Sequence, residues 1–115
     1  MEKVWQSIIR SLTENPRDVQ TTVKSDKKIP LWFHTSVISG KNGDVLIIEN
    51  AKLNSPSVSL SQKRRIYEKD FYVVYPFYLR RENGESVSSE LAQTKGEAKK
   101  NQTYIYGIVR NCTVK

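Results

Sequence analysis

The chain has 115 residues, of which 37% are hydrophobic and 27% are charged. This length and composition fit one globular domain of ordinary size and exclude a chain that is disordered by composition. Nineteen basic residues against twelve acidic residues give a net charge of +7. The isoelectric point near 9.6 lies above about 9, the region typical of nucleic-acid-binding domains. These values predict an acidic ligand or partner.

The single cysteine and the short apolar runs bear on the cellular compartment. Cys112 is the only cysteine, which excludes an internal disulfide and a cysteine-based metal cage, and fits a reducing compartment. No apolar run reaches the roughly 20 residues that span a bilayer, and residues 1–10 lack the continuous apolar segment of a signal peptide. We therefore predict a cytoplasmic protein with no membrane partner.

The first half of the sequence predicts a helix followed by a small antiparallel sheet. Apolar residues over 2–13 recur on one helical face, and Asn15-Pro16 ends that helix. Residues 18–24 are rich in β-branched side chains and predict a strand, which leads into a polar turn at 25–28. Two further strands at 30–38 and 45–48 flank Asn42-Gly43, a turn sequence that favours a hairpin over about 30–49.

The aromatic run in the second half admits two interpretations. Residues 50–62 resemble a loop, and a short strand at 57–60 is the alternative. In the run that follows, aromatic and β-branched content favours a strand. Phe71, Val74, Tyr75 and Tyr78 nevertheless lie at helical spacing, so we favour a helix over about 68–81. Pro76 is awkward in either structure, and we expect it to kink the helix or to delay its start.

The rest of the chain is polar and then apolar. Residues 84–100 predict a mobile polar loop, with a helical alternative around 89–99. Thr103–Val109 is apolar and predicts a closing strand or a short helix that is capped by Asn101. The predicted fold is therefore a single α+β domain over 1–115, with an N-terminal helix, a small antiparallel sheet centred on the hairpin, an aromatic and basic helix, and a short C-terminal element.

The residues that catalysis would require are nearly absent. His34 is the only histidine, which excludes metal sites with two histidines and leaves no serine triad with a nucleophile elbow. Asp44, Glu49 and Lys52 resemble a nuclease metal set, but the spacing from Glu49 to Lys52 is one residue too long, and Asp44 suits the hairpin turn. No glycine-rich phosphate loop occurs. We predict no enzymatic activity, no cofactor and no metal.

Binding is better supported, because basic residues flank the aromatic run. Residues 1–60 carry eight basic and six acidic side chains, whereas residues 61–115 carry eleven and six. If 68–81 is a helix, its basic ends lie roughly 20–25 Å apart, a span that would reach phosphates several base pairs apart. The basic residues are candidates for phosphate contact, and the two amides are candidates for base edges. The predicted nucleic-acid-binding residues are Lys63, Arg64, Arg65, Arg80, Arg81, Lys99, Lys100, Asn101 and Gln102.

The aromatic rings themselves are better explained as core than as a stacking surface, since a domain of this size needs them inside. The sequence thus predicts a non-catalytic nucleic-acid-binding module, with DNA favoured over RNA. The alternative is a protein–protein interaction factor, such as an inhibitor or an accessory protein of a mobile element, that binds an acidic partner through aromatic and arginine side chains. A third possibility is a recognition module of a larger protein.

Overall fold

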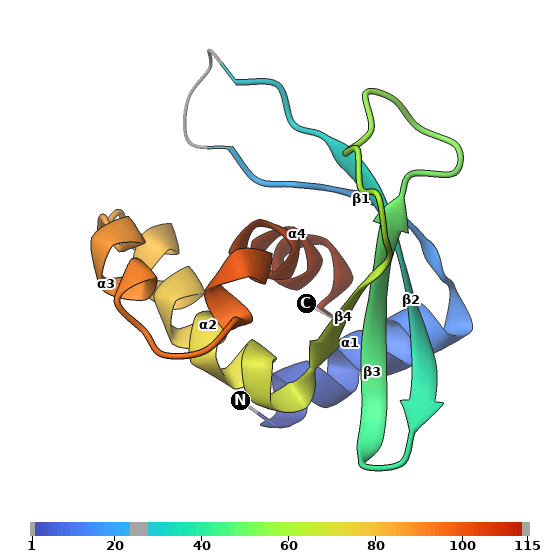
Figure 1. The fold of residues 1–115 in the computed structure, drawn as a ribbon, viewed down its shortest axis with the longest axis horizontal. Helices are drawn as coiled ribbons and strands as arrows, with labels where there is room; N and C mark the ends of the chain where they lie inside the picture. Colours follow the sequence, from blue (N-terminus) through green and yellow to red (C-terminus); the bar gives the residue numbers. More distant parts are fainter. Residues whose placement is uncertain (1, 24–27, 114–115) are drawn as a thin grey trace.

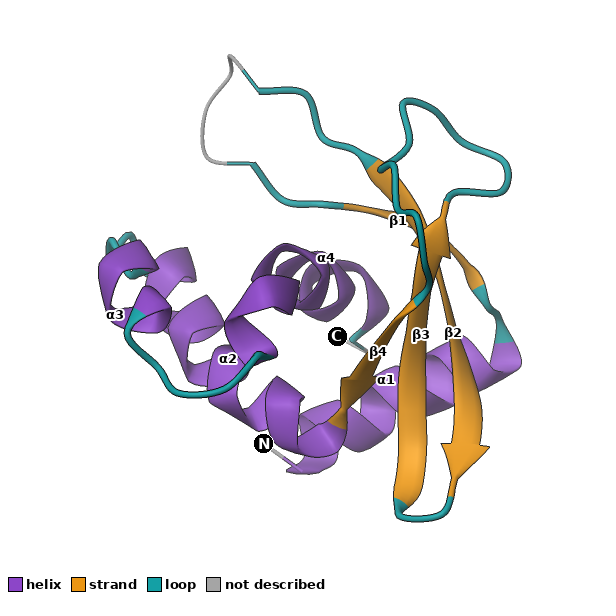
Figure 2. Cartoon of the chain, viewed as in Figure 1, coloured by secondary structure: helices purple, strands orange, loops and turns teal. Residues whose placement is uncertain are grey.

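The computed structural model describes residues 2–23 and 28–113. It is an α+β domain, as predicted, in which the helices lie on one side of a four-stranded antiparallel sheet (Figures 1 and 2). In the described part of the chain, none of the helices is long and apolar enough to cross a membrane. The elements are α1 (Glu2–Glu14), β1 (Arg17–Gln20), β2 (Trp32–Gly40), β3 (Gly43–Asn50), β4 (Arg64–Tyr67), α2 (Glu68–Glu82), α3 (Ser88–Ala92), the 3-10 helix η1 (Ala98–Asn101) and α4 (Gln102–Cys112).

The sheet is a simple meander, because each strand pairs with the next one along the chain. The predicted hairpin is present as β2 and β3, which meet at the pair Gly40–Gly43. Gly43 has a backbone φ of 120°, a conformation that residues with a Cβ rarely adopt. β1 occupies the start of the segment predicted at 18–24, and of the turn predicted at 25–28 only Lys28 lies within the described residues.

The core lies between the sheet and the helices. Phe33, Leu46, Ile48 and Ile66 project from the inner face of the sheet and are fully buried. Side chains of α1, α2 and α4 cover them, with Ile8, Leu12, Phe71, Val74, Ile105 and Ile108 among the best buried. Because side chains alternate along a strand, the residues between these positions form a second face. This outer face carries none of the described helices (Figure 2).

The aromatic run forms helix α2, so the helical interpretation was the right one. Phe71 is fully buried, stacks on Tyr75 with ring centroids 5.2 Å apart, and packs against Trp5 of α1 at 5.3 Å. The rings therefore serve as core. Pro76 lies inside the helix rather than at its start. Burial of Phe71 and Val74 against the sheet outweighs the backbone hydrogen bond that Pro76 cannot make.

Two segments after the hairpin differ in detail from the sequence prediction. β4 was not predicted, and residues 57–60 contribute only an isolated bridge from Ser57 to Trp32. The segment 84–100 contains α3 and η1, in agreement with the helical alternative, because Val87, Leu91 and Ala98 are buried. The C-terminal apolar segment is the helix α4, and Asn101 precedes it without a capping hydrogen bond from its side chain.

Helix α4 crosses the sheet at very close range, and Gly107 is the point of approach. A Cβ at position 107 would lie 2.5 Å from the backbone oxygen of Gln20 and 3.3 Å from the Phe33 ring. Asn111 reinforces the approach, since its amide donates to Gln20 at 3.3 Å and to Gly107 at 2.8 Å. Glycine thus permits a contact between α4 and β1 that positions the first turns of the helix.

Asp18 fastens the loop after β3 to the edge of the sheet. Its side chain, only 3% exposed, accepts hydrogen bonds from the backbone N–H groups of Lys52, Leu53 and Asn54 and from His34. Burial acts to raise the pKa of the Asp18 carboxyl, but these donors together hold it well below its usual range. His34 therefore has a structural partner in Asp18.

Candidate functional site

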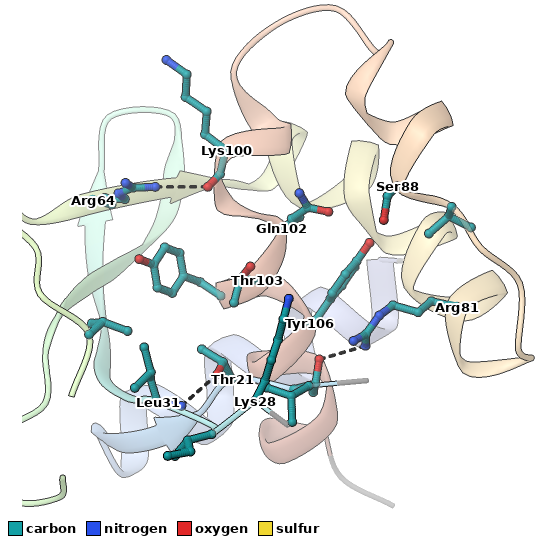
Figure 3. Close-up of a pocket in the computed structure, with 16 residues that line it drawn as sticks. Thr21, Lys28, Leu31, Arg64, Arg81, Ser88, Lys100, Gln102, Thr103 and Tyr106 are labelled. Carbon is teal, nitrogen blue, oxygen red and sulfur yellow. Dashed lines mark hydrogen bonds between the residues drawn. The ribbon is translucent and has the colours of Figure 1, made fainter. Parts of the chain in front are cut away.

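A cavity of about 720 Å³ lies beside the first turns of α4. It lies between the ends of β4 and α2, and residues 21–23 and 28–31 close it from another side (Figure 3). We call it the basic cavity, because four cationic side chains and no acidic side chain are among its described lining residues. The lining residues with polar side chains are Thr21, Thr22, Lys28, Arg64, Arg81, Ser88, Lys100, Gln102, Thr103, Tyr104 and Tyr106.

Six of the predicted binding residues form three adjacent pairs, and in each pair one residue lines the cavity and the other does not. The pairs are Arg64–Arg65, Arg80–Arg81 and Lys99–Lys100. In the first pair, Arg64 faces inward. Its guanidinium donates to the backbone oxygen of Lys100 at 3.1 Å and lies 5.4 Å from the centre of the Tyr104 ring. Arg65 is exposed and opposite Ile47 on the outer face. The alternation of a strand explains the division, since Arg64 shares a face with the buried Ile66.

In the second pair, Arg81 lines the cavity and Arg80 does not. The Arg81 guanidinium donates to Thr22 Oγ1 at 2.9 Å and lies 4.9 Å from the centre of the Tyr106 ring. Arg80 instead donates to Glu85 at 3.1 Å and to both carboxylate oxygens of Glu90 at 2.7 and 2.8 Å. Arg80 is therefore neutralised locally, while Arg81 has no carboxylate partner among the described residues.

In the third pair, Lys100 lines the cavity and Lys99 is used to hold the chain. The ammonium group of Lys99 donates to the backbone oxygens of Ala92 and Thr94 at 3.1 and 2.9 Å, which closes the segment after α3. Lys100 is exposed and pairs with Glu97, a pair in which both side chains are more than half exposed. An exposed pair of this kind is weak, so Lys100 remains open to exchange Glu97 for another anion.

The remaining predicted residues are only partly brought together. Gln102 lines the cavity. Asn101 is not among the lining residues, but its side-chain oxygen accepts a hydrogen bond from Arg64 at 3.4 Å. Lys63 lies away from the cavity, 70% exposed and 3.9 Å from Glu49. Sequence reasoning missed Lys28, which the fold brings to the cavity wall. Its only sequence signal was its position in a polar turn.

Tyr106 contributes an unusual hydroxyl to the cavity wall. The residue is 5% exposed, and its oxygen has no hydrogen-bond partner among the described residues. In Figure 3 the hydroxyl points toward Ser88 and Gln102, two other lining residues. Burial raises the pKa of Tyr106, although the nearby Arg81 acts in the opposite direction. The hydroxyl is therefore protonated at neutral pH and available as a donor.

The described residues contain no group of three or more histidine, cysteine, aspartate or glutamate side chains placed to hold a metal ion. The arrangement of the basic cavity suits an anion instead: guanidinium and ammonium groups supply charge, and hydroxyl and amide groups supply hydrogen bonds. Comparison with protein-family models, with curated proteins and with solved structures finds no match to this chain.

Proposed function

We propose that this protein is a non-catalytic nucleic-acid-binding module that holds phosphate groups of its ligand in the basic cavity. DNA is the ligand that we would test first. One observation supports this function above all: Arg64, Arg81 and Lys100 come from three distant segments and line one cavity. Like charges repel, and neither Arg64 nor Arg81 has a carboxylate partner among the described residues, so their assembly favours an anionic ligand as the counter-charge.

The size of the cavity agrees with an extended polyanion that is bound in part. Its volume of about 720 Å³ lies in the range of roughly 300–1,000 Å³ found for pockets that bind small ligands. One or two nucleotides would fill it, while the rest of the ligand would run over the exposed surface. Threonine and tyrosine hydroxyls next to the cations can add hydrogen bonds to phosphate and sugar oxygens.

Salt dependence tests this function directly. If the four cations of the cavity contact phosphates of a single strand, its affinity should fall about 50-fold between about 50 and 200 mM salt. Removing one of the four contacts should reduce that loss to about 20-fold. Fluorescence anisotropy with labelled mixed-sequence oligonucleotides, both single strands and duplexes, measures both quantities.

The adjacent pairs provide matched controls, because each pair offers the same change of charge at neighbouring positions. Arg81→Gln should weaken binding roughly 10-fold, the effect of losing one charge-assisted hydrogen bond, whereas Arg80→Gln should change it less than about 2-fold. Lys100→Ala and Lys99→Ala form a second such comparison. Equal effects within both pairs would show that overall charge rather than the cavity governs binding. Thermal unfolding confirms that each variant is folded.

A second candidate function, docking of an acidic protein, rests on the outer face of the sheet. Ile38 and Tyr67 are 43% and 42% exposed there, beside Arg65 and Lys41. Exposed apolar and arginine side chains in one patch are typical of protein interfaces. If the protein binds neither single strands nor duplexes at about 50 mM salt, the cavity hypothesis is wrong and this face becomes the leading candidate.

A further inference from the structure

Lys28, Arg64 and Arg81 border one hollow instead of following a line, while the Lys100 side chain extends away from it (Figure 3). Arg64 and Arg81 lie on opposite sides of the cavity, with Thr103 and Tyr106 of α4 between them (Figure 3). Proteins that follow a duplex groove need basic groups spaced along its axis, as we expected for the two ends of α2. The structure instead directs Arg64 of β4 and Arg81 in the last turn of α2 into a common hollow.

The two arginines are also recessed. Both are only partly exposed, and each is fixed by a hydrogen bond and by a neighbouring tyrosine ring. Because both line the cavity, we expect a phosphate to approach them through it. Duplex DNA is stiff, with a persistence length of about 150 base pairs, and its phosphates lie on a convex surface. The backbone of a single strand can bend and bring a phosphate, sugar and base inside.

The environment of the Tyr106 hydroxyl also favours a ligand of this kind. It is a buried donor without a partner among the described residues, and an unsatisfied buried donor is costly, so a ligand oxygen that accepts from it would bind more tightly. A lone phosphate at Arg64 or Lys100 would lie on the other side of the cavity from it (Figure 3). A whole nucleotide extends far enough to place a second acceptor oxygen at the hydroxyl.

We infer that the basic cavity takes an unpaired nucleotide of a single strand, with its phosphate at Arg64 and a further acceptor oxygen at the Tyr106 hydroxyl. This inference rests on the proposed function, which requires only that nucleic acid binds through the cavity. It adds strandedness: the protein selects single strands, overhangs or unpaired ends over continuous duplex.

The test uses the full chain and three labelled DNA ligands of one sequence: a single strand, a blunt duplex, and a duplex with a single-stranded overhang. We expect the single strand and the overhang to bind at least about 10-fold more tightly than the blunt duplex. Tyr106→Phe removes only the hydroxyl oxygen and keeps the ring beside Arg81. It should weaken binding of the single strand about 3- to 10-fold, the usual worth of one hydrogen bond, and leave the weak binding of duplex unchanged.

The same variant should not lose stability, since it removes a buried hydroxyl that lacks a partner. Weaker binding together with an equal or higher melting temperature therefore distinguishes a ligand contact from a structural role. Two results would overturn the inference while the proposed function stands: equal affinity for duplex and single strand with both sensitive to Arg81→Gln, or unchanged binding of the single strand by Tyr106→Phe. Absence of binding to all three ligands would overturn both.

Discussion

Replacing Gly107 with alanine tests the close approach of α4 to the sheet. In an ordinary exposed helix position this change stabilises a protein, because alanine has the better helix propensity by about 1 kcal/mol. Here the added methyl group would lie 2.5 Å from the backbone oxygen of Gln20, and real Cβ atoms essentially never come closer than 3.0 Å to such an atom. The helix or the strand must therefore move.

The expected cost follows from what surrounds position 107. Overpacking of a dense core costs about 1–3 kcal/mol. The Gln20 carbonyl belongs to the backbone and the Phe33 ring is fully buried, so neither can move aside as an exposed side chain would. Moving α4 outward would also lengthen the hydrogen bond from Asn111 to Gln20, now 3.3 Å, at a cost of about 0.5–1.5 kcal/mol. After the gain in helix propensity, we expect Gly107→Ala to destabilise the protein by about 1–3 kcal/mol.

Urea denaturation measured by tryptophan fluorescence suits this test, since Trp5 is buried in the core. Gln6→Ala, at an exposed position of α1, controls for helix propensity alone and should leave stability nearly unchanged. Gly107→Val should be worse than Gly107→Ala, because a larger side chain meets the same carbonyl. A Gly107→Ala variant as stable as the original chain would refute the reasoning, since α4 would then have room to move away.

Three further predictions concern buried groups. Asp18→Ala should lower the free energy of unfolding by about 2–3 kcal/mol at neutral pH, because an ionised hydrogen-bond acceptor is lost. Folding depresses the pKa of Asp18, so the stabilisation by this carboxylate is present above about pH 4 and is lost below it. The urea denaturation curves of the two proteins should therefore converge in acid. Burial raises the pKa of Cys112 to about 11 from an ordinary 9.0, so a disulfide reagent should modify it at least about 100-fold more slowly in the folded than in the urea-unfolded protein. Thr35 is fully buried and its hydroxyl has no partner among the described residues, so Thr35→Val should raise stability by about 1 kcal/mol, as thermal unfolding would show.

Secondary structure was predictable where periodicity extended over several turns or a turn sequence marked the hairpin. Helix α2 has four apolar residues at helical spacing, and the hairpin has Asn42-Gly43 between two apolar runs. β4 was not predictable in this way, because only Ile66 of its four residues is buried and a single position carries no period. The segment that forms α4 could be predicted only as a strand or a helix, because Gly107 lowers its helix propensity. The reason for a glycine there is the close approach of β1, which the sequence does not show.

The candidate site was predictable as a set of basic pairs, but not as a cavity. Charge counts identified Arg80 and Arg81 equally, and the sequence holds no local signal that Glu90 neutralises one while the other turns inward. For Arg64 and Arg65 the signal was present but unused: recognition of β4 would have placed Arg64 on the same face as Ile66. Lys28 and Tyr106 join the cavity through tertiary packing alone.

The origin of the cavity cations in segments far apart along the chain has a thermodynamic consequence. An unfolded chain holds Lys28, Arg64 and Arg81 at no fixed separation, so the ligand site exists only in the native state. Binding and folding are therefore linked: a ligand at 100 times its dissociation constant would add about 2.7 kcal/mol to the free energy of unfolding. The melting temperature of this protein is then itself a sensor of its ligand, which allows candidate anions to be screened by heat before any label is attached.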